Sequence, residues 1–376
     1  MARHVGAVNR SRLAVTAAPA RPAGSWVGQT VIVKRGGVRY GRTDPQTGQP
    51  VCFGKLKHLS YRVEADEGAW VRVRQDGVSG WVAKAEVALP SEAVDYFTAQ
   101  IRRRPTSDAY HRRAVAWRKR GELDSAVADF TEAIRRDPKA GAVFNGRGVA
   151  WDDKQEYDKA IIDYTEAIRL DPEDARAFYN RGNAWWCKQE YDRAVADYTE
   201  AVRLDPTFAL AFNNRGVAWS DQKAYDQAVA DFTEAIRLDP TGAVAYYNRG
   251  VAWEAKREYG KAIADYTEAI RLDPKDPSAF NGRAWLWATC PDGRYRDGKR
   301  AVKSARKAWA RRGWSEPIIF GTLAAAYAEA GQFDKAVKYQ TKALASPEYE
   351  QAYGETARQR LTLYEQRQPY RSEGND

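Results

Sequence analysis

The dipeptide Asp-Pro recurs at a fixed interval of 34 residues through the middle of the chain. A period of about 20 to 50 residues is typical of proteins built from stacked, repeated helical or strand units. We therefore expect residues 107–274 to form five regular copies of one unit, with proline at position 32 of each copy. The aspartates that begin the five dipeptides are Asp137, Asp171, Asp205, Asp239 and Asp273.

The residue pattern inside each copy predicts two helices. Positions 4, 8 and 11 lie on one face of a helix, and positions 20, 24 and 27 form a second such face. Proline at position 32 lacks a backbone donor and disfavours helical geometry in the residue before it, so the second helix ends there. Position 11 is tryptophan in every copy, at Trp117, Trp151, Trp185, Trp219, Trp253 and, in a sixth copy, Trp287.

One helical hairpin is too small to cover its own tryptophan, so we expect the copies to stack. The small residues at positions 8 and 20 would let the helix axes approach closely. We expect each indole to be buried between neighbouring copies.

This frame resembles the tetratricopeptide repeat family, with aromatic residues at positions 4, 11 and 24, small residues at 8, 20 and 27, and proline at 32. Residues 275–346 resemble two degenerate repeats, the sixth copy keeping Phe280 and Ala284 around an inserted loop. The resemblance implies an α-solenoid, and residues 347–376 would supply a capping helix and a C-terminal tail.

Position 7 departs from the family, in which leucine is usual there. It is arginine in six copies, and position 23 is aspartate in the five regular copies. We predict a ladder of ion pairs between neighbouring helices, with a structural role.

The N-terminal quarter follows a different pattern. Residues 1–25 are basic and carry no acid, which indicates a disordered tail. Residues 26–90 alternate apolar and polar side chains between glycine-rich turns, which predicts a small closed sheet. The run Gly80, Trp81, Val82 resembles the final strand of bacterial SH3-like domains. That resemblance implies a shallow groove lined by Tyr61, Trp70 and Trp81, although packing explains these aromatic residues equally well.

Residues 91–106 predict a helix that connects this SH3-like β-barrel to the repeats. The chain would therefore be a multi-domain, mainly α protein. The combination of a barrel with such an array resembles a group of bacterial repeat proteins common in planctomycetes.

The tetratricopeptide resemblance implies a concave surface formed by positions 2, 5, 9, 12 and 13 of the first helices. A peptide or protein segment would bind there through amides and aromatic anchors. For each position, solvated surface is the competing interpretation, and Trp186, beside the structural Trp185, is the one we favour for binding. The candidates are Asn145, Asp153, Arg176, Tyr179, Asn183, Trp186, Asn213, Asp221 and Tyr247.

The carboxylate clamp of some family members needs Lys and Asn at positions 5 and 9 of one repeat. His111 and Val115 stand at these positions in the first repeat, which argues against binding of a chaperone's acidic tail. Acidic groups on the same face suit a partner with basic residues.

Charge is unevenly distributed. Residues 1–138 and 275–376 carry net charges of +10 and +6, and residues 139–274 carry −6. The alternative hypothesis is therefore an electrostatic binder of nucleic acid or of an anionic envelope polymer. We do not favour nucleic acid, because the basic residues of 299–312 spread around several helical faces and no base-stacking module accompanies them.

Three cysteines and three histidines, all far apart, offer little material for a disulfide framework, a metal site or a catalytic triad. We expect no enzyme activity and no cofactor, and a monomer or weak oligomer. No apolar run is long enough to span a membrane. No signal peptide is recognisable, which favours the cytoplasm, while export stays open if the start of the chain is truncated or misplaced.

Overall fold

The computed structural model describes residues 26–36, 38–43, 50–56, 58–75, 78–311 and 316–372. The predicted tail, residues 1–25, lies outside these described residues. The helices and strands fall into two compact units, one that ends at Leu204 and one that begins at Asp205.

The first unit begins with a seven-stranded antiparallel sheet in the order β3-β2-β6-β5-β4-β1-β7. Its core contains Val31, Val63, Val71 and Val82, all of them at most 1% exposed, which confirms the expected alternation of inward apolar residues. The strands are β1 (Thr30–Val33), β2 (Arg39–Thr43), β3 (Pro50–Lys55), β4 (Ser60–Glu67), β5 (Trp70–Gln75), β6 (Val78–Ala83) and β7 (Val87–Ala88).

The sheet joins the helices through direct contacts. Helix α1 (Pro90–Arg103) follows β7 almost at once, and its Phe97 shares one hydrophobic cluster with Ile32 of β1 and Ala88 of β7. Arg112 of α2 is buried and donates from Nη1 to the carbonyl oxygen of Val33 at 2.9 Å. The sheet therefore contacts the first repeat through both apolar packing and a buried hydrogen bond.

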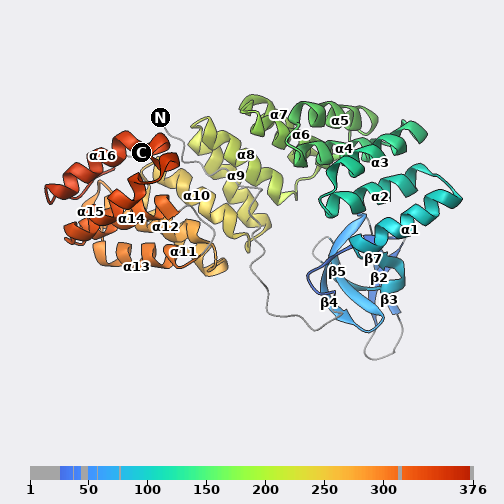
Figure 1. The fold of residues 1–376 in the computed structure, drawn as a ribbon, viewed down its shortest axis with the longest axis horizontal. Helices are drawn as coiled ribbons and strands as arrows, with labels where there is room; N and C mark the ends of the chain where they lie inside the picture. Colours follow the sequence, from blue (N-terminus) through green and yellow to red (C-terminus); the bar gives the residue numbers. More distant parts are fainter. Residues whose placement is uncertain are drawn as a thin grey trace. The chain divides into compact units, whose positions relative to one another are not determined.

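From α2 onwards the helices form consecutive antiparallel pairs, one pair to each copy of the repeat (Figure 1). The first unit holds α2 (Ser107–Lys119), α3 (Leu123–Arg136), α4 (Gly141–Asp153), α5 (Tyr157–Leu170), α6 (Ala175–Cys187) and α7 (Tyr191–Leu204). The second holds α8 (Ala209–Asp221), α9 (Tyr225–Leu238), α10 (Ala243–Ala255), α11 (Tyr259–Leu272), α12 (Pro277–Thr289), α13 (Gly298–Trp309), α14 (Glu316–Glu329), α15 (Phe333–Leu344) and α16 (Pro347–Glu365).

The aromatic residue at position 24 fills the centre of each regular hairpin. It is at most 1% exposed in all five copies, as Phe130, Tyr164, Tyr198, Phe232 and Tyr266. It packs against glycine at position 8 in the second to fifth copies, and a Cβ atom added to Gly148 would lie only 2.6 Å from Cε1 of Tyr164. The absence of a side chain at position 8 is therefore what admits the ring.

The prediction that the tryptophans of position 11 are buried is confirmed only in part. All six indoles are half-buried. In five of the six copies the charged end of a lysine or arginine lies over the ring, for example Lys261 Nζ at 4.4 Å from the centre of the Trp253 ring. Position 11 lies near the end of the first helix, where cations of the turn and second helix lie over the ring, joined at Trp287 by Arg283 of the first helix itself.

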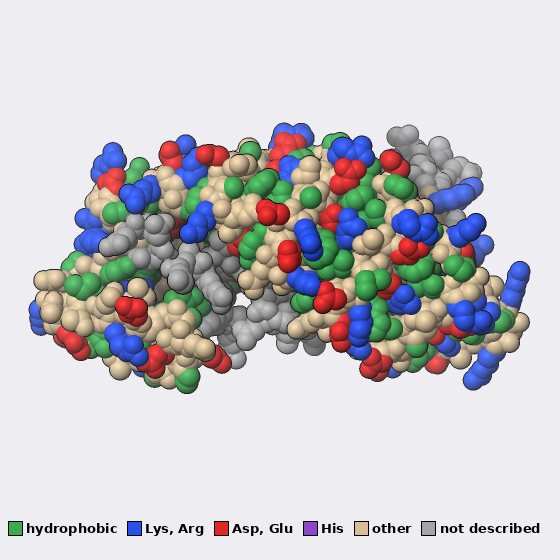
Figure 2. Space-filling model, turned by 90° about the horizontal axis from the view of Figure 1, so that it is seen from above, with side chains coloured by type: hydrophobic (Ala, Val, Ile, Leu, Met, Phe, Trp, Pro, Cys, Tyr) green, Lys and Arg blue, Asp and Glu red, His purple; other side chains and the backbone are tan. Residues whose placement is uncertain are grey.

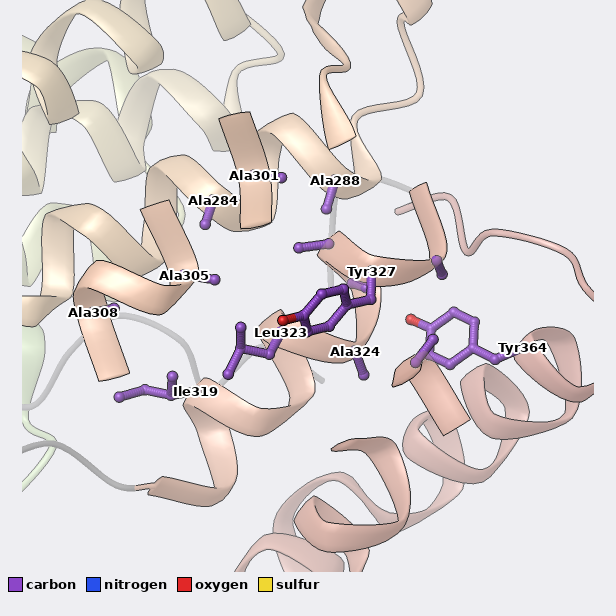
Figure 3. Close-up of a cluster of buried hydrophobic side chains, with 14 of the residues drawn as sticks. Ala284, Ala288, Ala301, Ala305, Ala308, Ile319, Leu323, Ala324, Tyr327 and Tyr364 are labelled. Atoms are coloured by element: carbon purple, nitrogen blue, oxygen red, sulfur yellow. The ribbon is translucent and has the colours of Figure 1, made fainter. Parts of the chain in front are cut away.

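The last repeats build the largest apolar cluster of the second unit. Alanines of α12 and α13 approach Ile319 and Leu323 of α14, and the rings of Tyr327 and Tyr364 lie near each other at its other end (Figure 3). Helix α16 thus packs an apolar face onto this cluster, and its role as a capping helix stays a prediction.

A candidate binding face and the ion-pair ladder behind it

The predicted arginine–aspartate ladder is confirmed in all five regular copies. Each arginine binds both carboxylate oxygens of its aspartate through Nε and Nη2, at 2.7 to 2.9 Å. The aspartates are between 3% and 7% exposed. The pairs are Arg113 with Asp129, Arg147 with Asp163, Arg181 with Asp197, Arg215 with Asp231, and Arg249 with Asp265.

The same arginines also connect one copy to the copy before it. Nη1 of Arg147 donates to Oγ1 of Thr131 at 3.1 Å, and Arg181 and Arg249 make the equivalent bond to Thr165 and Thr233. The guanidinium groups of these three arginines therefore connect the two helices of their own hairpin with the second helix of the preceding one, which is why arginine suits this position better than lysine.

The ladder loses its acid at the sixth copy. Arg283 still donates to Thr267 at 2.9 Å, but position 23 is Ser304, whose hydroxyl donates to the carbonyl oxygen of Phe280. Among the described residues, the Arg283 Nε has no hydrogen-bond partner, and its guanidinium lies over the rings of Trp287 and Phe280. Burial lowers the pKa of Arg283.

Positions 2, 5, 9, 12 and 13 of the first helices form the surface that we call the inner face. On this face in the first unit, Asn145 of α4 is half-buried and accepts at Oδ1 from Asn180 of α6 at 3.0 Å. Asp153 is exposed and pairs with Arg118 of α2 at 3.0 Å. Both candidates therefore join successive first helices and still have surface open to solvent.

In the third copy the face combines a buried amide with two accessible rings. Asn183 is 4% exposed and accepts from the hydroxyl of Tyr198 at 2.8 Å. Tyr179 and Trp186 of the same helix α6 are half-buried. Arg176, at the start of α6, is exposed and lies 2.7 Å from Nδ1 of His58 in the N-terminal module.

The second unit contains the remaining candidates of the inner face. Asn213 is 7% exposed and accepts from Asn248 at 3.1 Å, so its amide oxygen is used inside the protein. Asp221 is half-buried at the end of α8. Tyr247 is half-buried, with its ring centre 5.8 Å from that of Tyr266.

One acid on this face has an altered protonation equilibrium. Glu254 of α10 accepts a hydrogen bond from the hydroxyl of Tyr266 at 2.7 Å. Desolvation raises the pKa of the Glu254 carboxyl to about 7, against which the Tyr266 hydrogen bond acts only partly. The charge of the inner face in the fifth copy therefore changes near neutral pH.

The three aromatic candidates of the sheet have different environments. Tyr61 is 6% exposed, and its hydroxyl donates to Gln75 and accepts from the amide of His58, so it belongs to the core. Trp70 is 52% exposed, and Trp81 is half-buried with Arg72 lying 5.7 Å from its ring centre. Only the two tryptophans therefore offer accessible apolar surface.

Charges of both signs alternate on the face shown in Figure 2, where Lys and Arg side chains lie beside Asp and Glu side chains. The described residues contain no cluster of three or more His, Cys, Asp or Glu side chains that could hold a metal ion. A helix with the length and apolar character needed to cross a bilayer is likewise not found in the described part of the chain.

One feature of the inner face has no counterpart in the sequence predictions. The C-terminal segment 368–372 returns to α12, where Tyr370 contacts Trp285 and Ser372 bonds to Thr289. Trp285 stands at position 9 of the sixth copy. The signal in the sequence that could have indicated this contact is Tyr370, an aromatic residue in an otherwise polar segment.

Family models support the repeat assignment. Models described as tetratricopeptide repeat or TPR repeat match residues 86–141, 153–186, 175–208, 209–241, 243–276 and 319–348, which together make up more than half of the chain. No protein of curated function matches the chain.

Solved structures similar to this chain include one of the same fold, the first of the three that follow. A tetratricopeptide repeat protein from Parabacteroides merdae is 18% identical with a TM-score of 0.52, covering 69% of this chain and 98% of its own. YrrB, described as a TPR protein with an unusual peptide-binding site, is 25% identical with a TM-score of 0.43, covering 50% of this chain and 98% of its own. MamA is 23% identical with a TM-score of 0.41, covering 43% and 95%.

Proposed function

We propose that this chain, which belongs to the tetratricopeptide repeat family, is a non-enzymatic interaction scaffold that binds a peptide or protein segment on the inner face of its repeats. The likeness to a family of protein-interaction modules supports this class of function. The partner, in this proposal, is a segment with apolar anchors and basic residues.

The observation that carries the proposal is the accessible aromatic surface on α6. Trp185 belongs to the structural row of position 11 and is covered by Arg193, whereas Trp186 follows it on the inner face and is half-buried. Tyr179, two turns earlier on the same helix, provides a second ring. Aromatic rings bury much area at little cost in side-chain entropy, so this pair suits an apolar anchor of the partner.

The amides have a narrower role in this proposal. Asn183 and Asn213 are buried and bonded within the protein, so they position neighbouring side chains. Asn145 keeps accessible surface, as do Asp153 and Arg176. These three groups would supply polar contacts to the bound segment at the edge of the apolar anchor.

The N-terminal sheet would act as a second binding or docking surface. Its resemblance to bacterial SH3-like domains stays a prediction, and the exposed Trp70 beside half-buried Trp81 is the observation that supports a surface role. The resemblance of the whole chain to bacterial repeat proteins common in planctomycetes also stays a prediction.

The alternative is electrostatic binding of nucleic acid or an anionic envelope polymer by the basic flanks, residues 1–138 and 275–376. Salt separates the two mechanisms. Phosphate binding weakens steeply with rising salt, because the release of counterions on binding then gains less entropy, whereas an apolar anchor is little affected. We expect complexes captured from the native cell to survive a rise in ionic strength from about 0.05 to 0.2 M. Loss of binding by several orders of magnitude over that range would favour the alternative.

A further inference from the structure

The C-terminal segment occupies the inner face of the sixth copy. Helix α16 ends at Glu365, the backbone reverses at Arg367 with φ 58°, and residues 368–372 return to α12. The amide of Ser372 donates to the carbonyl oxygen of Thr289 at 2.9 Å. Trp285 and Thr289 are positions 9 and 13 of their copy, the same positions that form the inner face elsewhere.

An aromatic subsite receives Tyr370. Its ring centre lies 6.1 Å from that of Trp285, and the guanidinium carbon of Arg360 lies 5.2 Å from the Trp285 ring centre and 5.6 Å from that of Tyr370. Arg360 is 6% exposed and is held by a hydrogen bond to the hydroxyl of Tyr349 at 3.1 Å. A buried cation beside two ring faces favours an aromatic residue at this place.

A second subsite receives Arg371. Its Nη1 lies 2.7 Å from Oε2 of Glu329 in α14, and 3.5 Å from the carbonyl oxygen of Ala288. The last carbonyls of a helix have no partner within the helix and carry partial negative charge. Glu329 and the end of α12 together therefore favour a cation, and the planar guanidinium of arginine reaches both.

Residues 369–372 are half-buried and form no helix or strand. The contacts that hold them include the Tyr370 ring, the Arg371 charge and the backbone bond of Ser372. Tethering keeps the segment at high effective concentration, and a free ligand with the same groups must compete against that tether.

We propose that this surface, the tail site formed by Trp285, Thr289, Glu329 and Arg360, binds an extended segment with an aromatic residue followed by arginine. Residues 368–372 occupy it in cis until a partner carrying the same pair displaces them. This deepens the proposed scaffold function by naming the chemistry of a partner. It concerns a different stretch of the inner face from Trp186, so the two are tested separately.

The test uses the full chain and a fluorescent peptide with the sequence of residues 366–372. In the double variant Tyr370→Ala/Arg371→Ala the tail site is open, so we expect the peptide to bind it at least about tenfold more tightly than it binds the wild type. Equal binding to the two chains, or no binding to the double variant, overturns the proposal.

Matched variants locate the binding. Adding Glu329→Gln to the double variant should weaken the peptide at least about tenfold, because the arginine loses its ion pair. Adding Trp186→Ala to the double variant instead should leave peptide binding unchanged. The experiment can therefore disprove binding at the tail site without deciding whether Trp186 binds a partner. A circular dichroism spectrum and melting curve like those of the double variant establish that each chain is folded.

A second copy is the competing occupant. If tails exchange between chains, the wild type should form dimers in sedimentation that Tyr370→Ala/Arg371→Ala abolishes, and that result overturns binding in cis. A wild-type monomer that gains affinity for the peptide on the double substitution supports it.

Discussion

Arg181 holds both oxygens of the Asp197 carboxylate, 16 residues further along the chain, at 2.8 Å each. The aspartate side chain is 9% exposed and that of the arginine 20%. The pair is therefore a largely buried ion pair, the clamp, that links the two helices of its hairpin. The bond from Arg181 to Thr165 also links this hairpin to the preceding one. This arrangement replaces the leucine that the family usually places at position 7.

Asp197→Ala should lower the free energy of unfolding by about 2 kcal/mol or more, because it leaves a guanidinium without its carboxylate in a poorly solvated place. Urea unfolding followed by circular dichroism measures this. The double variant Arg181→Leu/Asp197→Ala should lose less than the sum of the two single variants. The matched control is Arg203→Ala, which breaks an exposed pair with Glu200 and should change stability little. Strict additivity would contradict the clamp.

Ser304→Asp should raise the free energy of unfolding by about 1 kcal/mol, since it restores at position 23 the acid that Arg283 lacks. Ser304→Ala, which only removes the bond to the Phe280 carbonyl, is the control and should be destabilising. Arg283→Leu should cancel the gain from Ser304→Asp. A Ser304→Asp chain less stable than Ser304→Ala would show that α13 does not present position 23 to Arg283.

Glu254 predicts a pH dependence with a definite sign. Its pKa in the folded protein, about 7, lies above that of an unfolded chain, so the folded state binds more protons between about pH 4.5 and 7. The contribution of this group to stability is therefore present below about pH 4.5 and is lost as pH rises through 7. Glu254→Gln should remove this loss, so the stability of the variant relative to wild type should rise between about pH 4.5 and 7 in thermal melts and level off above that range. Parallel pH profiles of the two chains would contradict the assignment.

Phe130→Ala should cost about 3 to 5 kcal/mol, because the ring is 0% exposed at the centre of its hairpin. Trp117→Ala in the same copy should cost less, since that indole is half-buried and one ring face contacts Arg120. Chemical denaturation of both variants compares them directly. A larger loss of unfolding free energy for Trp117→Ala than for Phe130→Ala would show that the indole is the central packing residue of the hairpin.

The period of 34 residues was sufficient to predict the helical hairpins, because helix termination at Asp-Pro and apolar spacing are local properties. The ladder was also predictable, since arginine at position 7 and aspartate at position 23 recur together in all five regular copies. The partial burial of the tryptophans was not predictable. The pattern identifies which face of a helix is apolar but not how deeply that face is buried, and most of the cations that cover the rings come from the turn and the second helix.

Contacts between distant parts of the chain were beyond sequence reasoning. The bond from Arg112 to Val33 joins residues 79 apart, and the contact of Arg371 with Ala288 joins residues 83 apart. Neither has a repeating pattern that would indicate its partner. The same holds for the amides: their spacing indicated Asn183 as a candidate of the inner face, but not that it is buried and accepts a hydrogen bond from the hydroxyl of Tyr198.

The most direct test of the scaffold account compares proteins captured from the native cell by the wild-type chain and by Trp186→Ala. Trp253→Ala, which removes an indole of the structural row, serves as the control, with melting curves showing that each chain is folded. We predict that one protein captured by the wild type and by Trp253→Ala is lost or strongly reduced with Trp186→Ala. An identical set of captured proteins for all three chains would contradict binding at this face.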